Sequence, residues 1–328
     1  MMLWKSNQRC NFDCEYCFCS KEELSREHPL CGRFSPARIA GRFDGTGRSW
    51  TIFMTGGEPF LYPDFLELCL ELARNHFLAL NSNLSTSNVA RFAGEIDPSR
   101  VRTINASFHE RVLERSGKMG DFVGNVLRLQ SGGFPVKVEY VAYPPLFGRI
   151  DRDIRALREA GVRTVNLKVY RGTFGNRLYP RDYSPDERAL FLREGQDPAE
   201  IEFITEPFAF RGRPCRTGTD FLFMGMDGRI RRCPASSASY GDFLGGRYAL
   251  DPRPRPCPYP RCGSPWVGRE YAGGPKMSVR ETLRETFREG IPFLLDPDRV
   301  RRAVVSFRDR RRLRSPQDPS QPRSRGLS

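Results

Sequence analysis

Short apolar segments alternate with amphipathic segments over the first 180 residues of this 328-residue chain, and no other feature constrains its fold as much. Apolar or β-branched runs predict a short strand before Cys10 and further strands at residues 50–55, 77–81, 101–107, 136–142 and 162–170. Between them, apolar residues spaced three and four apart predict amphipathic helices. Strands that alternate with helices imply a parallel sheet with right-handed crossovers. We therefore predict the α/β class, as a partial (β/α)6 barrel of the TIM type with ligands at the carboxyl ends of its strands.

The rest of the chain has a different composition. A capping box at Ser184, with proline at the first helical position, predicts one more helix. From Cys215 onward the chain is rich in Gly, Pro and Cys, with a hairpin signal at residues 226–228. We therefore expect a small extension that needs a cross-link to fold, which its four cysteines can provide. Further helices are expected after Ser278 and after Pro297. The predicted organisation is a partial barrel over 1–180, a connecting helix and linker over 181–214, a Cys-rich extension over 215–275, C-terminal helices over 276–314, and a disordered basic tail over 315–328.

Ten cysteines occur in a chain whose opening residues are too few and too polar for a secretory signal. No apolar run reaches the roughly 20 residues that a membrane-spanning helix needs, so we expect a cytoplasmic protein that does not act at a membrane. Because the cytosol keeps thiols reduced, clustered cysteines there hold metal more often than they form disulfides. The cysteines of this chain fall into two groups, with Cys31 and Cys69 standing apart.

The net charge of +14 raises the possibility of a nucleic-acid partner. The tail from Arg308 to Ser328 alone holds seven arginines against two aspartates, which is a net charge of +5. Arginine also greatly outnumbers lysine along the whole chain, and only six lysines occur. This bias is compositional, and it argues against a dedicated surface for nucleic acid.

The first cysteine group has the spacing Cys-x3-Cys-x2-Cys, formed by Cys10, Cys14 and Cys17. Three thiolates so close together can each hold one corner of a 4Fe–4S cluster and leave the fourth iron without a protein ligand. Zinc sites also use short cysteine spacings, so a zinc ion whose coordination is completed by Cys19 or His28 is the alternative.

Two motifs together resemble those of the radical S-adenosylmethionine (SAM) superfamily. One is the Cys-x3-Cys-x-aromatic-Cys loop, with Tyr16 as its aromatic residue. The other is Gly56-Gly57-Glu58-Pro59, at the end of the second predicted strand. The resemblance implies that this second segment binds the amino group of SAM, and glycine and a carboxylate suit that role. It further implies that the open iron binds SAM, that an electron from the reduced cluster cleaves the sulfonium bond, and that the resulting 5′-deoxyadenosyl radical abstracts hydrogen from a substrate.

The resemblance suggests further cosubstrate contacts at the ends of later strands. Asn81 and Asn83 end the third strand and Ser107 ends the fourth, although polar residues there also cap the helix that follows. His109 faces the expected mouth of the barrel, as a substrate contact or as a solvated loop residue. Glu139 and Lys168 lie within predicted strands, where we expect them to pair with each other.

The second group contains Cys215, Cys233, Cys257 and Cys262. Four thiolates suit a closed 4Fe–4S site, and a structural zinc ion fits the same count. The Cys-x12-Gly-x4-Cys spacing resembles the start of the SPASM and twitch extensions, which implies one auxiliary cluster in residues 215–275. The shortage of further cysteines departs from the full SPASM pattern and favours the shorter twitch form.

The sequence leaves three functions open. The first is a radical SAM enzyme, an oxidoreductase or maturase that acts on a peptide or protein side chain, because relatives with such an extension commonly modify peptides. The second is radical modification of RNA or a small metabolite, which the net positive charge of the chain suggests. The third is a non-catalytic iron–sulfur protein that senses redox state or binds a partner. For either enzyme the resemblance implies a reducing partner such as a flavodoxin or ferredoxin.

Overall fold

The computed structural model describes residues 1–17, 19, 24–25, 32–195, 201, 208–260 and 262. The chain divides into two units, Met1–Lys276 and Met277–Ser328, and all described residues belong to the first. The helices expected after Ser278 and Pro297 and the tail over 315–328 therefore lie outside the described residues. No helix in the described ranges is both long enough and apolar enough to cross a membrane.

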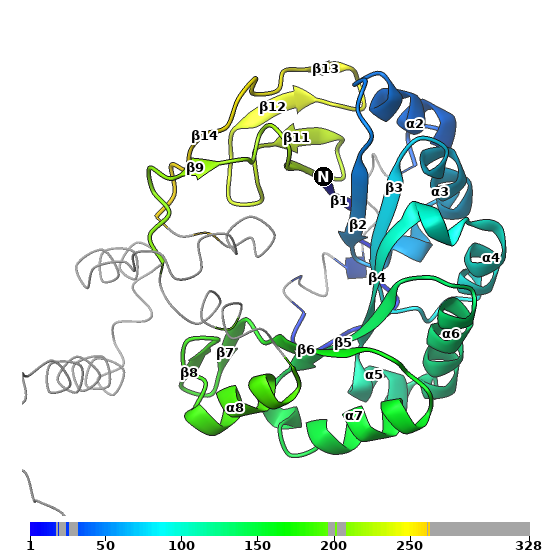
Figure 1. The fold of residues 1–328 in the computed structure, drawn as a ribbon, viewed down its shortest axis with the longest axis vertical. Helices are drawn as coiled ribbons and strands as arrows, with labels where there is room; N and C mark the ends of the chain where they lie inside the picture. The colour runs from blue at the N-terminus through cyan, green and yellow to red at the C-terminus, as the bar shows by residue number, and fades with distance from the viewer. Residues whose placement is uncertain are drawn as a thin grey trace, which may run out of the picture. The chain divides into compact units, whose positions relative to one another are not determined.

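Six parallel strands lie side by side in the order in which they occur along the chain. They are β1 (Met2–Asn7), β2 (Thr51–Gly56), β3 (Phe77–Ser82), β4 (Val101–Phe108), β5 (Val136–Ala142) and β6 (Val165–Val169). One or more helices separate each strand from the next, so the connections are crossovers, as Figure 1 shows. All six predicted strands are present, and the prediction of an α/β fold of the partial-barrel type is confirmed.

The helices follow the predicted periodicity. They are α2 (Pro36–Asp44), α3 (Phe65–Ala73), α4 (Asn88–Glu95), α5 (Glu110–Arg115), α6 (Met119–Ser131), α7 (Ile150–Glu159) and α8 (Pro185–Arg193), with the short 3-10 helices η1 (Pro59–Leu61), η2 (Pro98–Arg100) and η3 (Pro144–Leu146). The predicted capping box is present: the Ser184 hydroxyl accepts from the Glu187 backbone N–H, and the Glu187 carboxylate accepts from the Ser184 N–H. Sequence reasoning had not singled out α2, α4 or α5.

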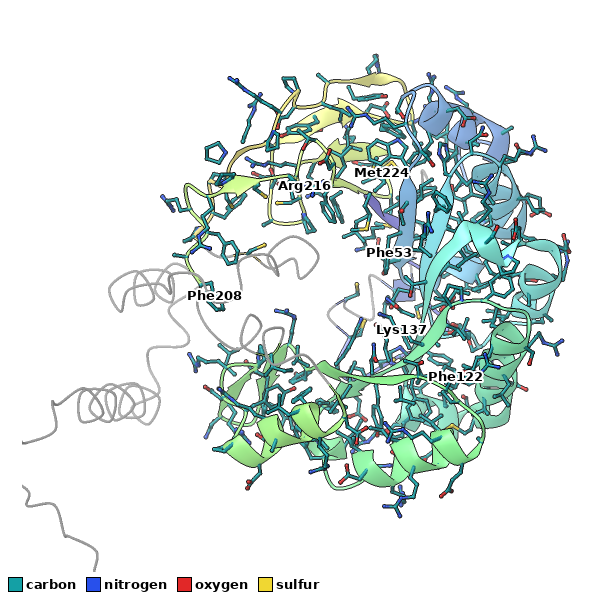
Figure 2. All side chains as sticks on the ribbon, viewed as in Figure 1. Phe53, Phe122, Lys137, Phe208, Arg216 and Met224 are labelled. Carbon is teal, nitrogen blue, oxygen red and sulfur yellow. The ribbon has the colours of Figure 1, made fainter. Side chains whose placement is uncertain are left out.

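Side chains along the strands alternate between the two faces of the sheet. Leu78 and Leu80 of β3 point toward the helices and belong to the main hydrophobic core. Ala79 points the other way and packs with Phe53 in a small apolar cluster on the inner face. Figure 2 shows Phe122 between α6 and the sheet, whereas Phe53 and Lys137 lie on the opposite side.

The Cys-rich segment continues this sheet. β10 (Leu222–Met224) pairs in parallel with β1, and β11 (Arg229–Arg231), β12 (Ser239–Asp242) and β13 (Arg247–Tyr248) follow in antiparallel order. The predicted hairpin at residues 226–228 joins β10 to β11, with Gly228 at a positive φ of 73°. Two small ribbons complete the fold: β7 (Gly172–Phe174) with β8 (Arg177–Tyr179), and β9 (Pro214–Cys215) with β14 (Arg255–Pro256). The domain boundaries proposed from the sequence stay a prediction.

Candidate active site

The first cysteine loop follows β1 at the carboxyl end of the parallel sheet. Cys10, Cys14 and Cys17 are all half-buried free thiols. The loop turns back at Cys17, whose N–H donates to the Cys14 carbonyl over 3.1 Å. Burial, and the neighbouring thiols, raise the pKa of Cys10 to about 11 and that of Cys14 to about 12. The Cys10 and Cys14 thiols are therefore poorly solvated, and the role of the three cysteines as ligands of one cluster stays a prediction.

The glycines of the Gly-Gly-Glu-Pro segment hold this loop in place. Gly56 has a φ of 133°, and a Cβ there would lie 2.1 Å from the Asn7 carbonyl oxygen. A Cβ on Gly57 would lie 2.1 Å from the Arg9 carbonyl oxygen. The sequence suggested that glycine allows a ligand to approach the backbone, but in the structure it is the backbone of residues 7–9 that approaches. Only glycine at these two positions lets the end of β2 pack directly against the start of the cysteine loop.

Glu58 is buried and connects the ends of two strands. Its Oε1 accepts hydrogen bonds from Ser82 Oγ over 2.6 Å and from the Phe60 N–H over 3.2 Å. Its Oε2 accepts from the Asn83 N–H over 2.7 Å. Burial raises the pKa of Glu58 to about 7 despite these three donors. The carboxylate thus accepts three hydrogen bonds from the protein itself, and cosubstrate binding by Gly56, Gly57, Glu58 and Pro59 stays a prediction.

Asn83 lies beside the cysteine loop. Its Nδ2 donates to Asn11 Oδ1 over 2.9 Å and lies 4.0 Å from Cys10 Sγ. Its Oδ1 accepts from both the N–H and the hydroxyl of Ser85, and Asn11 Nδ2 donates to the same hydroxyl. This closed network ties the end of β3 to the loop that contains Cys10, so the structure brings Asn83 to the site that the sequence predicted.

Tyr16 and His109 brace the other side of the loop. Tyr16 Oη lies 2.9 Å from His109 Nδ1, and the two rings lie 5.7 Å apart. Burial lowers the pKa of His109 to about 4, so the imidazole is neutral at physiological pH. Tyr16 also packs on Tyr143, which follows β5, with 5.1 Å between ring centroids. The interpretation of His109 as a solvated loop residue is wrong, because its ring holds the cysteine loop against the end of β4.

Polar side chains line the inner face at the ends of β3, β4 and β5. Asn81 pairs with Asn105 on the neighbouring strand, and Ser107 pairs with Glu139. Glu139 is 4% exposed and forms an ion pair with Lys168, which confirms the pairing expected from the sequence. The Lys137 ammonium lies 3.9 Å from the other Glu139 oxygen. Asn81 and Ser107 thus share the face on which the two lysines lie, and their contact with a cosubstrate stays a prediction.

The four cysteines of the second group line a single cavity of about 280 Å³. Cys215 also packs against the inner-face apolar cluster, and Cys257 and Cys262 pack against Phe208 and Phe210. That these four cysteines hold one auxiliary cluster stays a prediction. Within the described ranges, no three His, Cys, Asp or Glu side chains are arranged to hold a single metal ion.

The remaining cysteines lie elsewhere. Cys69, which stands apart from both groups in the sequence, is fully buried on the apolar face of α3. Cys19 is buried, while Cys31 lies outside the described residues.

The sequence matches the family model described as the radical SAM superfamily over residues 4–188, which is more than half of the chain. The chain belongs to the radical SAM superfamily. The matched range contains the Cys10–Cys17 loop, the Gly-Gly-Glu-Pro segment and all six parallel strands. The protein is therefore a radical SAM enzyme, and membership implies a 4Fe–4S cluster and SAM.

Curated relatives of this radical SAM enzyme include GTP 3′,8-cyclases. That of Brucella ovis is 29% identical over 146 residues, which are 41% of this chain and 42% of the relative. The mitochondrial GTP 3′,8-cyclase of Arabidopsis thaliana is 39% identical over 67 residues, 20% of this chain and 17% of that protein. The match thus spans about two fifths of the Brucella protein's length.

Solved structures share the fold over a longer range. The protein anSMEcpe with bound AdoMet has a TM-score of 0.54 at 12% identity, covering 74% of this chain and 78% of that one. SuiB of Streptococcus suis bound to S-adenosylmethionine has a TM-score of 0.53 at 13% identity, covering 77% and 66%. At such identities the likeness is one of fold, and it supports the partial barrel.

The residues of the cysteine loop fit the implied cluster. Three half-buried thiols on one loop would supply three ligands, and the Asn83 amide offers a hydrogen-bond donor near Cys10. Sequence reasoning missed two members of this site, Ser82 and Asn11. Short polar residues at a strand end and in a loop are too common to single out, and only the fold brings them to Glu58 and Asn83.

Proposed function

We propose that this radical SAM enzyme cleaves S-adenosylmethionine reductively at the Cys10, Cys14 and Cys17 site and abstracts hydrogen from a peptide or protein side chain. The bound cluster would supply the electron, and the chain would hold the cosubstrate and exclude water. The observation that carries this proposal is the convergence of the half-buried cysteine loop with the buried Glu58–Asn83 network.

Each protein group has a positional task in this proposal. Gly56 and Gly57 let the cysteine loop pack directly against β2, and Glu58 holds the end of β3 through its hydrogen bond from Ser82. Because the Glu58 carboxylate is engaged, the amino group of the cosubstrate would meet the backbone of this segment. Asn81, Asn83 and Ser107 would contact the ribose and carboxylate from the neighbouring strand ends.

The test is anaerobic incubation of reconstituted, reduced protein with S-adenosylmethionine. We expect 5′-deoxyadenosine and methionine in equal amounts, measured by liquid chromatography and mass spectrometry. Protein with a full cluster that yields neither product would contradict the proposal and favour a redox-sensing or partner-binding iron–sulfur protein.

Fold likeness supports a peptide as the substrate. One of the matching structures is anSMEcpe with bound AdoMet and the Kp18Cys peptide, with a TM-score of 0.51 over 74% of this chain. The auxiliary site also belongs to this proposal: Cys215, Cys233, Cys257 and Cys262 would hold one 4Fe–4S cluster, with zinc as the alternative metal. A flavodoxin or ferredoxin would serve as electron donor in the cytoplasm.

A small anionic metabolite is the second candidate substrate, and RNA, which is also anionic, is the third. The curated relatives named GTP 3′,8-cyclase favour a small metabolite. On the inner face, Lys137 and Lys168 are 37% and 45% exposed and share a single buried partner, Glu139. Two ammonium groups against one carboxylate leave a net positive charge beside Ser107, which suits a phosphate or carboxylate on the substrate.

Deuterium transfer distinguishes these substrates. Peptides with deuterated side chains, deuterated GTP and deuterated RNA would each be added to the cleavage assay, and deuterium in 5′-deoxyadenosine would identify the hydrogen donor. We expect transfer from a peptide. Transfer from GTP alone, abolished by Lys168→Met but not by Lys118→Met, would replace that proposal with a nucleotide substrate, and transfer from RNA would do so for nucleic acid.

A further inference from the structure

A buried arginine belongs to the second cysteine site. Arg232 immediately precedes Cys233, lines the cavity shared by the four cysteines and is 8% exposed. An arginine is seldom buried to this extent unless an anion or several hydrogen-bond acceptors compensate its charge.

The Arg232 guanidinium binds the backbone on both sides of the cavity. Its Nε donates to the Thr217 carbonyl over 3.1 Å and to the Thr217 hydroxyl over 3.0 Å. Its Nη1 donates to the Pro256 carbonyl over 3.0 Å, and Nη2 donates to the Arg255 carbonyl. Thr217 lies two residues after Cys215, and Pro256 immediately precedes Cys257.

These contacts fix the spacing of three ligands at once. β9 and β14 pair with Cys215 opposite Arg255, so the two strands already lie side by side. Arg232 adds a brace from a third segment, the end of the β10–β11 hairpin. The Cys215 thiol lies 3.1 Å from the Thr217 hydroxyl, which in turn accepts from Arg232. One side chain thereby positions the segments of Cys215, Cys233 and Cys257.

The charge of Arg232 has no carboxylate partner within the described part of the chain, since all its acceptors there are neutral oxygens. The buried carboxylate of this region, Asp251, is paired with Arg255 and accepts a hydrogen bond from Tyr240. A buried cation whose acceptors are all neutral oxygens favours an anion in the adjoining cavity. Four thiolates around a 4Fe–4S core, or around a divalent ion, carry a net negative charge.

We propose that Arg232 is the positioning residue and counter-charge of a metal–thiolate centre held by Cys215, Cys233, Cys257 and Cys262. This inference rests on the auxiliary site of the proposed function and assigns a role to a residue that is not itself a ligand. Loss of such an outer partner weakens metal retention by about 10- to 100-fold. For an iron–sulfur centre, loss of the positive charge also favours the oxidised state, and the reduction potential falls.

The experiment uses the full chain with Cys10, Cys14 and Cys17 changed to Ala, so that iron, sulfide and zinc report the second site alone. Arg232→Met is compared with Arg232→Lys and with the control Arg231→Met, whose guanidinium packs over Phe223. We expect metal per chain to fall in both Arg232 variants after exposure to a chelator and to stay unchanged in the control. Where iron is retained, redox titration monitored by EPR should give a lower potential for Arg232→Met, and for Arg232→Lys one close to that of the parent.

Different outcomes would contradict the role of Arg232 and the auxiliary iron–sulfur cluster of the proposed function. Metal retention and potential in both Arg232 variants equal to those of the parent protein would overturn the inference. Zinc without iron in the parent protein would contradict the auxiliary cluster, and loss of that zinc only in the Arg232 variants would still support the role of Arg232. Where Arg232→Met fails to fold by circular dichroism, Arg232→Lys provides the test, since it keeps the charge and loses the multiple donors.

Discussion

Cys14 is the middle residue of the cysteine loop, and its thiol is strongly desolvated, with its pKa raised to about 12. A Cys14→Ala variant should form no 5′-deoxyadenosine, because two thiols cannot hold the cluster, while iron at the second cysteine group is retained. Cys19→Ala, in the same part of the chain, is the matched control and should keep cleavage activity. Parallel iron analysis and product assay measure both. Cleavage that survives in Cys14→Ala would show that the cluster lies elsewhere.

Glu58 gives the fold a pH dependence whose sign follows from its raised pKa. Below its ordinary pKa of 4.5 the carboxyl is protonated in both the folded and the unfolded chain. In that range the stability that the raised pKa of about 7 gives to the folded state is present in full. That contribution is lost as the pH rises from 4.5 to 7, and it amounts to about 3 kcal/mol.

Glu58→Gln removes this titration and keeps the shape of the side chain. Urea unfolding of the metal-free protein between pH 5 and pH 8 should therefore show the stability of the wild type falling relative to Glu58→Gln, mostly below pH 7. A constant difference between the two proteins over this range would mean that the Glu58 pKa is not raised in the folded state.

At the scale of elements, Gly57 joins β2 to the cysteine loop. In Gly57→Ala the new Cβ would lie 2.1 Å from the Arg9 carbonyl, so the loop must move away from the strand. We expect cluster content and cleavage activity to fall at least about tenfold with the helical signal unchanged. Gly124→Ala is the control, because its Cβ would meet nothing within 4 Å and alanine favours the helix by up to about 1 kcal/mol. Equal losses in both variants would exclude this account.

Arg149 holds three carboxylates where α5 and α7 meet. It pairs with Glu110, whose side chain is fully buried, and with Glu114 and Asp153. Its removal leaves these charges uncompensated, so Arg149→Met should lower the free energy of unfolding by about 3–5 kcal/mol. Arg193 pairs with the exposed Asp151, so Arg193→Met should cost less than about 1 kcal/mol. Thermal and urea unfolding compare the two, and a similar small loss in both would refute the network's role.

The elements that the sequence predicted are those whose signals are local. The strand at residues 136–142 and the helix around Phe122 follow from the spacing of their own apolar residues. Three cysteines and a Gly-Gly-Glu-Pro segment likewise identify the site from short stretches of chain. What the sequence did not reveal are contacts between distant segments, such as Ser82 with Glu58 or Tyr16 with His109. The paired residues lie 24 and 93 positions apart in the sequence, and no local pattern of residues indicates a contact over such a separation.

At the scale of the whole molecule, the sheet joins the two cysteine sites. β10 pairs with β1, so the strand that leads into the first cysteine loop is also the neighbour of the second site. The sequence did not reveal that the Cys-rich extension continues the sheet, because the parallel pairing of residues 2–4 with 222–224 is a contact across more than 200 residues. A change at the second site therefore has a direct structural route to the first, through β1.

A chain that ends at residue 214 should expose this shared edge. Without β10, the backbone of β1 loses its partner on one side, beside Met2 and Trp4, which are almost fully buried in the complete sheet. An unpaired, apolar edge strand invites aggregation, so we expect chain 1–214 to be insoluble or oligomeric by size-exclusion chromatography. A chain ending at residue 276 keeps all of β1 to β14 and should remain monodisperse with full cleavage activity. A monodisperse, active chain 1–214 would show that the six-stranded part folds alone, and that the extension adds a second site without supporting the first.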